Sequence, residues 1–202
     1  MSGWNSHFEL LEQQGWAVTD HALPEGMPLN LFHECQNFWQ EGHFTEAKIG
    51  RGSEKSKQTA IRGDSICWLS SEQTPGVCSE FLNWTEQLRK ELNTRYYLGL
   101  KREEFHFARY PIGAGYQKHL DQHRGQTERK ISLVLYLNPT WAPNDGGELC
   151  LYAPENPSLE IGRVLPQLGR LVLFRSDLIP HEVLSCLQVR WSLTGWFRTD
   201  FI

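Results

Sequence analysis

Apolar side chains recur at intervals of three or four residues in the first half of the chain. Trp4, Phe8 and Leu11 follow this spacing before Gly15, which predicts an amphipathic helix that a glycine ends. The same period appears twice more before residue 95. The predicted helices span 4–14, 29–40 and 77–92.

After Asn93 the hydrophobic period changes to 2, the repeat of a half-buried β-strand. Many short strands separated by turn residues are typical of a sandwich or barrel. We therefore predict an α+β fold in which a double-stranded β-helix, or jelly-roll, core is braced by N-terminal helices. The predicted strands span 16–19, 65–69, 105–110, 116–121, 131–137, 148–152, 161–164, 169–174, 179–185 and 189–197.

The length predicts a single domain over residues 1–202. Residues 1–95 are expected to supply mainly helical support, and residues 96–202 the jelly-roll core. No internal repeat, low-complexity segment or linker divides the sequence.

Residues 44–62 differ from their surroundings because they are small and polar and show no period. This composition predicts a mobile loop. Gly50, Gly52 and Ser53 lead us to expect that the loop closes over a substrate, although a solvated connection would have the same composition.

Composition narrows the classes of function. The formal charge is −4 and no basic stripe is visible, so nucleic acid is not an expected partner. Five cysteines without CxxC spacing indicate a reducing compartment rather than a disulfide framework. Neither a signal-peptide pattern nor a run of about 18 apolar residues is present. We therefore expect a cytoplasmic protein that binds neither nucleic acid nor a membrane.

A histidine and a carboxylate stand two positions apart in the segment Gln-Lys-His-Leu-Asp, as His119 and Asp121. On a strand, this spacing would place both side chains on one face. An imidazole and a carboxylate are two members of the 2-His-1-carboxylate triad that holds non-haem Fe(II). A surface pair in a turn would give the same spacing, so the motif alone is weak.

Two downstream residues strengthen the metal hypothesis. His181 lies near the start of a predicted strand and is a candidate third ligand, since strands far apart in the sequence lie face to face in a jelly roll. Arg190, nine positions later, would share a strand face with Thr194 and Trp196. A buried arginine is costly unless it pairs with an anion, and its guanidinium matches a carboxylate in a bidentate manner. The sequence therefore offers three metal ligands and a receptor for a carboxylate.

Beyond these residues, whole segments match a known pattern. They are Arg109–Asp121, Tyr136–Trp141 with Gly146–Leu149, and His181–Val183 with Arg190–Phe197. They resemble the 2-oxoglutarate and Fe(II)-dependent dioxygenases, and within them the prolyl 4-hydroxylases of the oxygen-sensing type. Phe44-Thr45 and Ile61–Asp64 with Trp68 resemble the oxygen-sensing branch in particular. The turn from Tyr110 to His119 is one residue shorter than the animal pattern, a departure that affects the expected position of Tyr110 and not the ligands. The compact sequence, without extra domains, leads us to expect a bacterial relative.

The resemblance implies roles for three groups of residues. The Fe(II) ligands would be His119, Asp121 and His181, which form the catalytic set together with Arg190. Contacts to 2-oxoglutarate would come from Arg190, Tyr136, Tyr110 and Thr194. Contacts to the substrate would come from Arg129, Arg62, Trp68 and Trp196. Taken alone, each tyrosine is more often a half-buried strand aromatic, and a lone rim arginine is usually a solvated or surface-paired side chain.

The resemblance further implies an enzyme that uses O2 and 2-oxoglutarate to form 4-hydroxyproline in an intracellular protein. Succinate and CO2 would be released, and ascorbate is a candidate reductant. The implied partner carries an exposed prolyl loop: the elongation factor that delivers aminoacyl-tRNA in bacteria, or the hypoxia-inducible factor in animals. Two alternatives stay open, an oxygenase for another residue or a small molecule, and a non-catalytic jelly-roll binding module.

Overall fold

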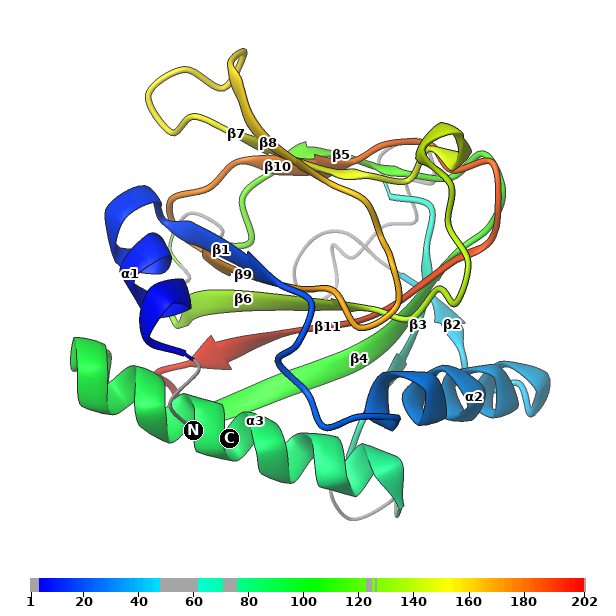
Figure 1. The fold of residues 1–202 in the computed structure, drawn as a ribbon, viewed down its shortest axis with the longest axis horizontal. Helices are drawn as coiled ribbons and strands as arrows, with labels where there is room; N and C mark the ends of the chain where they lie inside the picture. Colours follow the sequence, from blue (N-terminus) through cyan, green and yellow to red (C-terminus); the bar gives the residue numbers. More distant parts are fainter. Residues whose placement is uncertain (1–3, 48–61, 71–75, 123–124, 126, 202) are drawn as a thin grey trace.

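The computed structural model describes residues 4–47, 62–70, 76–122, 125 and 127–201. Within these ranges the chain forms two antiparallel sheets and three α-helices (Figure 1). The seven-stranded sheet contains, in spatial order, β1 (Trp16–Thr19), β9 (Leu171–Arg175), β6 (Arg129–Tyr136), β11 (Arg190–Arg198), β4 (Arg102–Tyr110), β3 (Ser65–Trp68) and β2 (Thr45–Glu46). The four-stranded sheet contains β5 (Tyr116–His119), β10 (His181–Val183), β7 (Leu149–Tyr152) and β8 (Glu160–Val164), with the 3-10 turn η2 (Pro143–Asp145) before β7.

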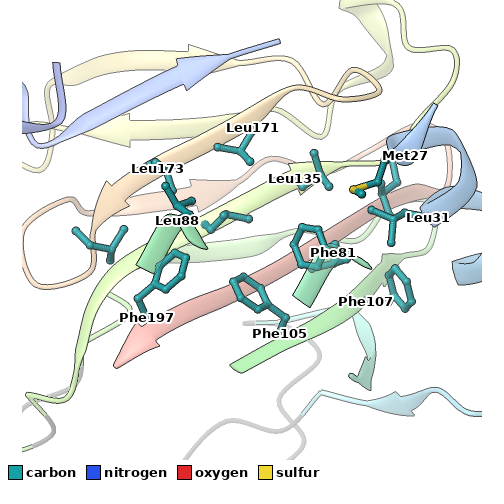
Figure 2. Packing of buried hydrophobic residues seen from close by; sticks show 14 of the residues in the cluster. Met27, Leu31, Phe81, Leu88, Phe105, Phe107, Leu135, Leu171, Leu173 and Phe197 are labelled. Carbon is teal, nitrogen blue, oxygen red and sulfur yellow. The ribbon is translucent and has the colours of Figure 1, made fainter. Parts of the chain in front are cut away.

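The helices cover one face of the seven-stranded sheet (Figure 1). They are α1 (Asn5–Gln14), α2 (Met27–Gln40) and α3 (Val77–Tyr96). Figure 2 shows how Leu31 and Phe81 of the helices pack against Phe107 and Leu135 of the strands. This cluster is the main hydrophobic core, and it holds the sheet that carries most of the candidate site residues.

Successive residues of the central strands serve opposite faces of the sheet, as the pleat requires. In β11, Leu193 and Phe197 belong to the core under the helices, whereas Arg190 and Thr194 face a cavity. Gly195 pairs with Phe105 of β4, and a Cβ at Gly195 would overlap the Phe105 ring. The central sheet therefore separates a hydrophobic layer from a polar one.

The predicted helices and strands are all present, with boundaries shifted by a few residues. The largest shift concerns α3, which continues past residue 92 to Tyr96. Asn93 interrupts the hydrophobic period because its side chain is used for hydrogen bonds to the backbone of Leu100. Its Oδ1 accepts from the Leu100 N–H at 2.8 Å, and its Nδ2 donates to the Leu100 carbonyl at 2.9 Å. Among the described residues, no helix combines the length and the apolar character needed to cross a bilayer.

Two local expectations are wrong. The predicted loop 44–62 starts with strand β2, in which Thr45 pairs with Ile66 of β3, because an edge strand needs no hydrophobic pattern of its own. Residues 48–61, and with them the expected closure over a substrate, lie outside the described residues. The predicted strand 116–121 ends at His119, so Asp121 follows β5 instead of belonging to it.

Candidate active site

Three metal-ligand side chains converge where β5 meets β10. His119 and His181 are direct partners in the antiparallel register, and Asp121 lies two residues beyond the end of β5. The Nε2 atoms of His119 and His181 lie 3.5 and 3.7 Å from Oδ1 of Asp121. The ligand atoms of this group all lie within 4.8 Å of one another, and no other group of this kind was found in the described part of the chain.

Hydrogen bonds around the ligands prepare them for a metal ion. Nδ1 of His119 lies 2.7 Å from the Gln117 carbonyl, and Nδ1 of His181 lies 3.0 Å from the Ile179 carbonyl. A carbonyl accepts only from a protonated Nδ1, which leaves the Nε2 lone pair free for a metal. Two nitrogens and one carboxylate are the donor set of non-haem Fe(II) sites, so these residues fit that ion.

The carboxylate has its own support. The Ser132 hydroxyl donates to Oδ2 of Asp121 at 2.6 Å and lies 2.8 Å from the Ser176 hydroxyl. Burial alone would raise the pKa of Asp121, but His181, His119 and Ser132 together hold it well below its usual range. Burial, followed by the neighbouring His119, lowers the pKa of His181 to about 4. At neutral pH the group therefore holds an anionic carboxylate and a neutral imidazole, the forms that bind a metal.

The ligands line a cavity of about 720 Å³ between the two sheets. Alternate residues of β3, β4 and β11 form one wall, and β5 and β10 contribute the opposite one. The cavity takes in all the site residues predicted from the sequence except Tyr136, a buried residue on the same face of β6 as the cavity-lining Val134. The predicted residues are thus brought to one place by strands from both sheets.

Arg190 is a buried charge without a carboxylate partner among the described residues. Its side chain is 1% exposed, and its Nε donates to the Gly147 carbonyl at 2.9 Å. Its guanidinium lies 5.0 Å from the ring centres of both Tyr110 and Tyr136. A Cβ at Gly147 would approach Cδ of Arg190 to 3.1 Å, so glycine gives this guanidinium room.

The Tyr136 hydroxyl is also buried and has no hydrogen-bond partner among the described residues. Burial raises the pKa of Tyr136 to about 12, so the group remains a neutral donor. A buried guanidinium beside an unsatisfied hydroxyl is costly until an anion pairs with both. The two residues therefore fit a carboxylate such as the distal group of 2-oxoglutarate.

The four predicted substrate-contact residues all line the cavity, and the ring centres of Trp68 and Trp196 lie 6.4 Å apart. Arg62 makes a two-point ion pair with buried Asp64, at 2.7 and 2.9 Å. Trp68, four residues after Asp64 at the end of β3, is 49% exposed. Arg129 stacks on Trp196, with its guanidinium carbon 3.4 Å from the ring centre. Thr194, predicted to contact 2-oxoglutarate, lies 3.4 Å from the Ser192 hydroxyl.

Sequence reasoning missed His106 and Glu104 of β4 and Arg198 of β11, which also line the cavity. Each lies on the same strand face as a residue predicted from the sequence, which is Tyr110 in β4 or Trp196 in β11. Counting back in steps of two from Tyr110 would have found the first two. Ser132 carries no such signal, since a serine inside an apolar strand is usually an ordinary core residue.

His106 is a buried histidine outside the metal group. It is 1% exposed, and its ring centre lies 4.7 Å from that of Trp68 and 5.5 Å from that of Trp196. Its Nδ1 has no partner among the described residues. Burial, with Arg62 as the next cause, lowers the pKa of His106 to about 3. The imidazole is therefore neutral throughout the physiological range.

His106 should make the folded state sensitive to acid. The ordinary pKa of 6.5 falls to about 3 on folding, so below pH 6.5 the unfolded chain takes up a proton that the folded chain refuses. Each unit by which the pH falls in this window lowers the free energy of unfolding by about 1.4 kcal/mol. Between pH 6.5 and pH 5, the free energy of unfolding of the wild type should fall by about 2 kcal/mol more than that of His106→Phe.

Urea unfolding of both proteins at the two pH values measures this difference, and His106→Gln serves as a second variant should the phenylalanine not fit. Equal pH dependence in the wild type and in both variants would contradict the buried, neutral state of His106.

Comparison with known sequences points to one family. A sequence model described as the 2OG-Fe(II) oxygenase superfamily matches residues 105–198. The chain is 28% identical over 193 residues to the human protein named prolyl hydroxylase EGLN3, covering 93% of this chain and 80% of that one. It is 27% identical over 197 residues to a Caenorhabditis elegans protein named hypoxia-inducible factor prolyl hydroxylase, of which it covers 27%.

Solved structures agree over nearly the whole chain. A Pseudomonas putida prolyl-4-hydroxylase superposes with a TM-score of 0.85 and 38% identity, covering 97% of this chain and 98% of that one. A Trichoplax adhaerens prolyl hydroxylase in complex with a hypoxia-inducible factor peptide fragment gives a TM-score of 0.85 and 26% identity, covering 96% and 88%. The matched region contains every residue of the metal group.

Proposed function

Because the chain belongs to the 2OG-Fe(II) oxygenase superfamily, we propose that it hydroxylates a prolyl residue of another protein, using O2 and 2-oxoglutarate. Members of the family are oxidoreductases that depend on Fe(II) and 2-oxoglutarate. One observation carries the proposal: the His119, Asp121 and His181 group shares a cavity with a buried arginine that has no carboxylate partner among the described residues. The prolyl preference rests on the names of the similar proteins.

The proposed roles follow from the positions of the side chains. His119, Asp121 and His181 would hold Fe(II), and Arg190 would pair with the distal carboxylate of 2-oxoglutarate. The neutral hydroxyl of Tyr136 would donate to the same carboxylate, and Tyr110 and Thr194 are further proposed contacts. With both groups bound, one atom of O2 enters succinate as CO2 is lost, and the other enters a C–H bond of the substrate.

The protein's own contribution is to fix and shield these groups. Ser132 orients the Asp121 carboxylate, and the two backbone carbonyls at Gln117 and Ile179 orient the imidazoles. Apolar side chains pack against the ligands, such as Phe174, whose ring centre lies 4.6 Å from that of His181. Such order favours oxidation of a bound substrate over wasted turnover.

A protein substrate is supported by the size of the cavity and by the aromatic and cationic residues on it. Arg62, Trp68, Arg129 and Trp196 are the proposed contacts. A ring such as proline would pack on the tryptophans, while the arginines would bind backbone carbonyls next to it. The complex of the Trichoplax protein with a peptide fragment supports a peptide-sized ligand.

Finer features of the proposal come from the family resemblance. We propose hydroxylation at C4, and the elongation factor that delivers aminoacyl-tRNA as the partner of a bacterial member. We also propose that residues 1–202 form one domain whose two sheets make a double-stranded β-helix, because strands β1 to β3 of the first ninety-five residues join the larger sheet. All five cysteines are free and buried, which supports a cytoplasmic location.

The test is an assay with purified protein, Fe(II), 2-oxoglutarate and O2. The elongation factor and a hypoxia-inducible factor peptide are offered separately, and succinate and a +16 Da shift on proline are measured. We expect one of them to stimulate succinate formation and to gain the oxygen, and His119→Ala to do neither. Succinate formation without an oxidised proline in any protein would move the substrate to another residue or a small molecule.

A further inference from the structure

We propose that Glu104 is a positioning residue that holds Arg129 against Trp196 and so shapes the substrate wall before the substrate arrives. The proposal rests on the proposed function, because it assigns Arg129 and Trp196 to substrate binding. Neither the sequence motifs nor the names of similar proteins assign a role to Glu104.

Glu104 is placed to act across the strand ladder. It lies directly opposite Trp196 in the pairing of β4 with β11. Its Oε1 accepts a hydrogen bond from Nη2 of Arg129 at 3.0 Å and from Nη1 of Arg198 at 2.7 Å. The side chains of Glu104 and Arg129 are 20% and 24% exposed, so the pair is partly shielded from water. A charge-assisted hydrogen bond in such surroundings is stronger than a neutral one.

Arg129 depends on this carboxylate for its orientation. Its guanidinium carbon lies 3.4 Å from the ring centre of Trp196, and its Nη1 lies 3.5 Å from the Asp121 carbonyl. The bond to the carbonyl is longer than an ordinary N–H···O hydrogen bond and is therefore weak. The Glu104 bond fixes the guanidinium plane, and without it a long, flexible side chain would rotate away from the indole.

The charges around Glu104 also favour its hold on Arg129. Arg102, Arg129 and Arg198 all bond to Glu104, the first at 3.4 Å. Removing the carboxylate's charge would leave three neighbouring cations to repel one another, which favours the departure of Arg129 from the cluster. Asp200 bonds Arg102 at 2.9 Å and Arg198 at 2.8 Å, and none of its bonds reaches Arg129.

Asp200 thus provides a matched control within the same cluster. Glu104→Gln and Asp200→Asn each remove one negative charge and keep the size of the side chain, but only the first releases Arg129. We expect Glu104→Gln to raise KM for the proline-containing protein about fivefold. The increase is expected in KM rather than in kcat, and Asp200→Asn should leave KM unchanged.

A double-mutant cycle tests whether Glu104 acts through Arg129. In an Arg129→Ala background, Glu104→Gln should have no further effect on KM. Equal effects in both backgrounds, or an effect of Asp200→Asn as large as that of Glu104→Gln, would overturn the proposal. Melting temperatures of all four variants show whether a change in KM follows from a loss of folding.

A second measurement does not depend on activity. In protein labelled with 5-fluorotryptophan, the ¹⁹F resonance of Trp196 is identified as the signal that Trp196→Phe removes. Glu104→Gln should shift this resonance as Arg129 leaves the ring, and Asp200→Asn should not. An unmoved resonance overturns the positioning role, whereas absence of prolyl hydroxylation by the wild type overturns the proposed function alone.

Discussion

Replacing Asp121 with asparagine is expected to abolish activity by removing the metal. The change keeps the shape of the side chain but removes the negative charge that faces the imidazoles of His119 and His181. A missing supporting group alone costs about 10- to 100-fold in metal affinity, so loss of a ligand charge should cost at least about 100-fold. Iron content after dialysis against a limiting chelator, together with succinate formation, measures the effect.

Asp64→Asn is the matched control for this experiment. Asp64 is a second buried carboxylate on the same cavity, 3% exposed, but its partner is Arg62 and it is not part of the metal group. We expect the Asp64 variant to keep its iron. Iron retained by Asp121→Asn, or lost equally by both variants, would contradict the assignment of Asp121 as a ligand.

The second large effect is expected at Arg190. In the wild type, 2-oxoglutarate should raise the free energy of unfolding by about 2.7 kcal/mol at 100 times its Kd. Arg190→Met should lose this gain and with it all turnover, because Arg62, Arg129 and Arg198, which also line the cavity, are each already paired with a carboxylate. The ligand-free variant should nevertheless be at least as stable as the wild type, since methionine removes a buried charge that lacks a carboxylate partner.

Thermal unfolding with and without 2-oxoglutarate measures both effects. Arg109→Met is the control: Arg109 stands next to Tyr110 in β4, and its guanidinium carbon stacks 4.0 Å from the ring centre of Trp39, outside the cavity. This variant should keep the stabilisation by 2-oxoglutarate. A ligand-free Arg190 variant that is much less stable than the wild type would show that the arginine serves the fold.

The sequence predicted the strongly periodic parts of the fold and the chemistry of the site. The helix at 77–92 and the strand at 16–19 carry clear hydrophobic patterns, and both are present. The strand β4 was predicted to begin at residue 105 because Arg102, Glu103 and Glu104 interrupt its apolar alternation. In the structure these charges are paired, Glu103 with Arg89 and Glu104 with Arg102 and Arg129, which a sequence pattern does not reveal.

The sequence predicted which residues form the site, but it did not predict how they are arranged in space. The His-x-Asp motif, His181 and Arg190 identified the metal and carboxylate chemistry, because these residue types have few other combined uses. The direct pairing of His119 with His181 depends on strand register, which long-range packing decides. The support of Asp121 by Ser132 and the hold of Glu104 on Arg129 depend on the same packing.

The alternation of cavity-facing and core-facing residues along the central strands also has a consequence for protein engineering. Residues 66, 68, 106, 108, 194 and 196 face the cavity, while their neighbours 105, 107, 193 and 197 fill the core under the helices. A library restricted to the first set would vary pocket shape and polarity without changing the side chains of the core under the helices. Pocket residues and the residues of that core can therefore be varied separately, by choosing alternate positions of the same strands.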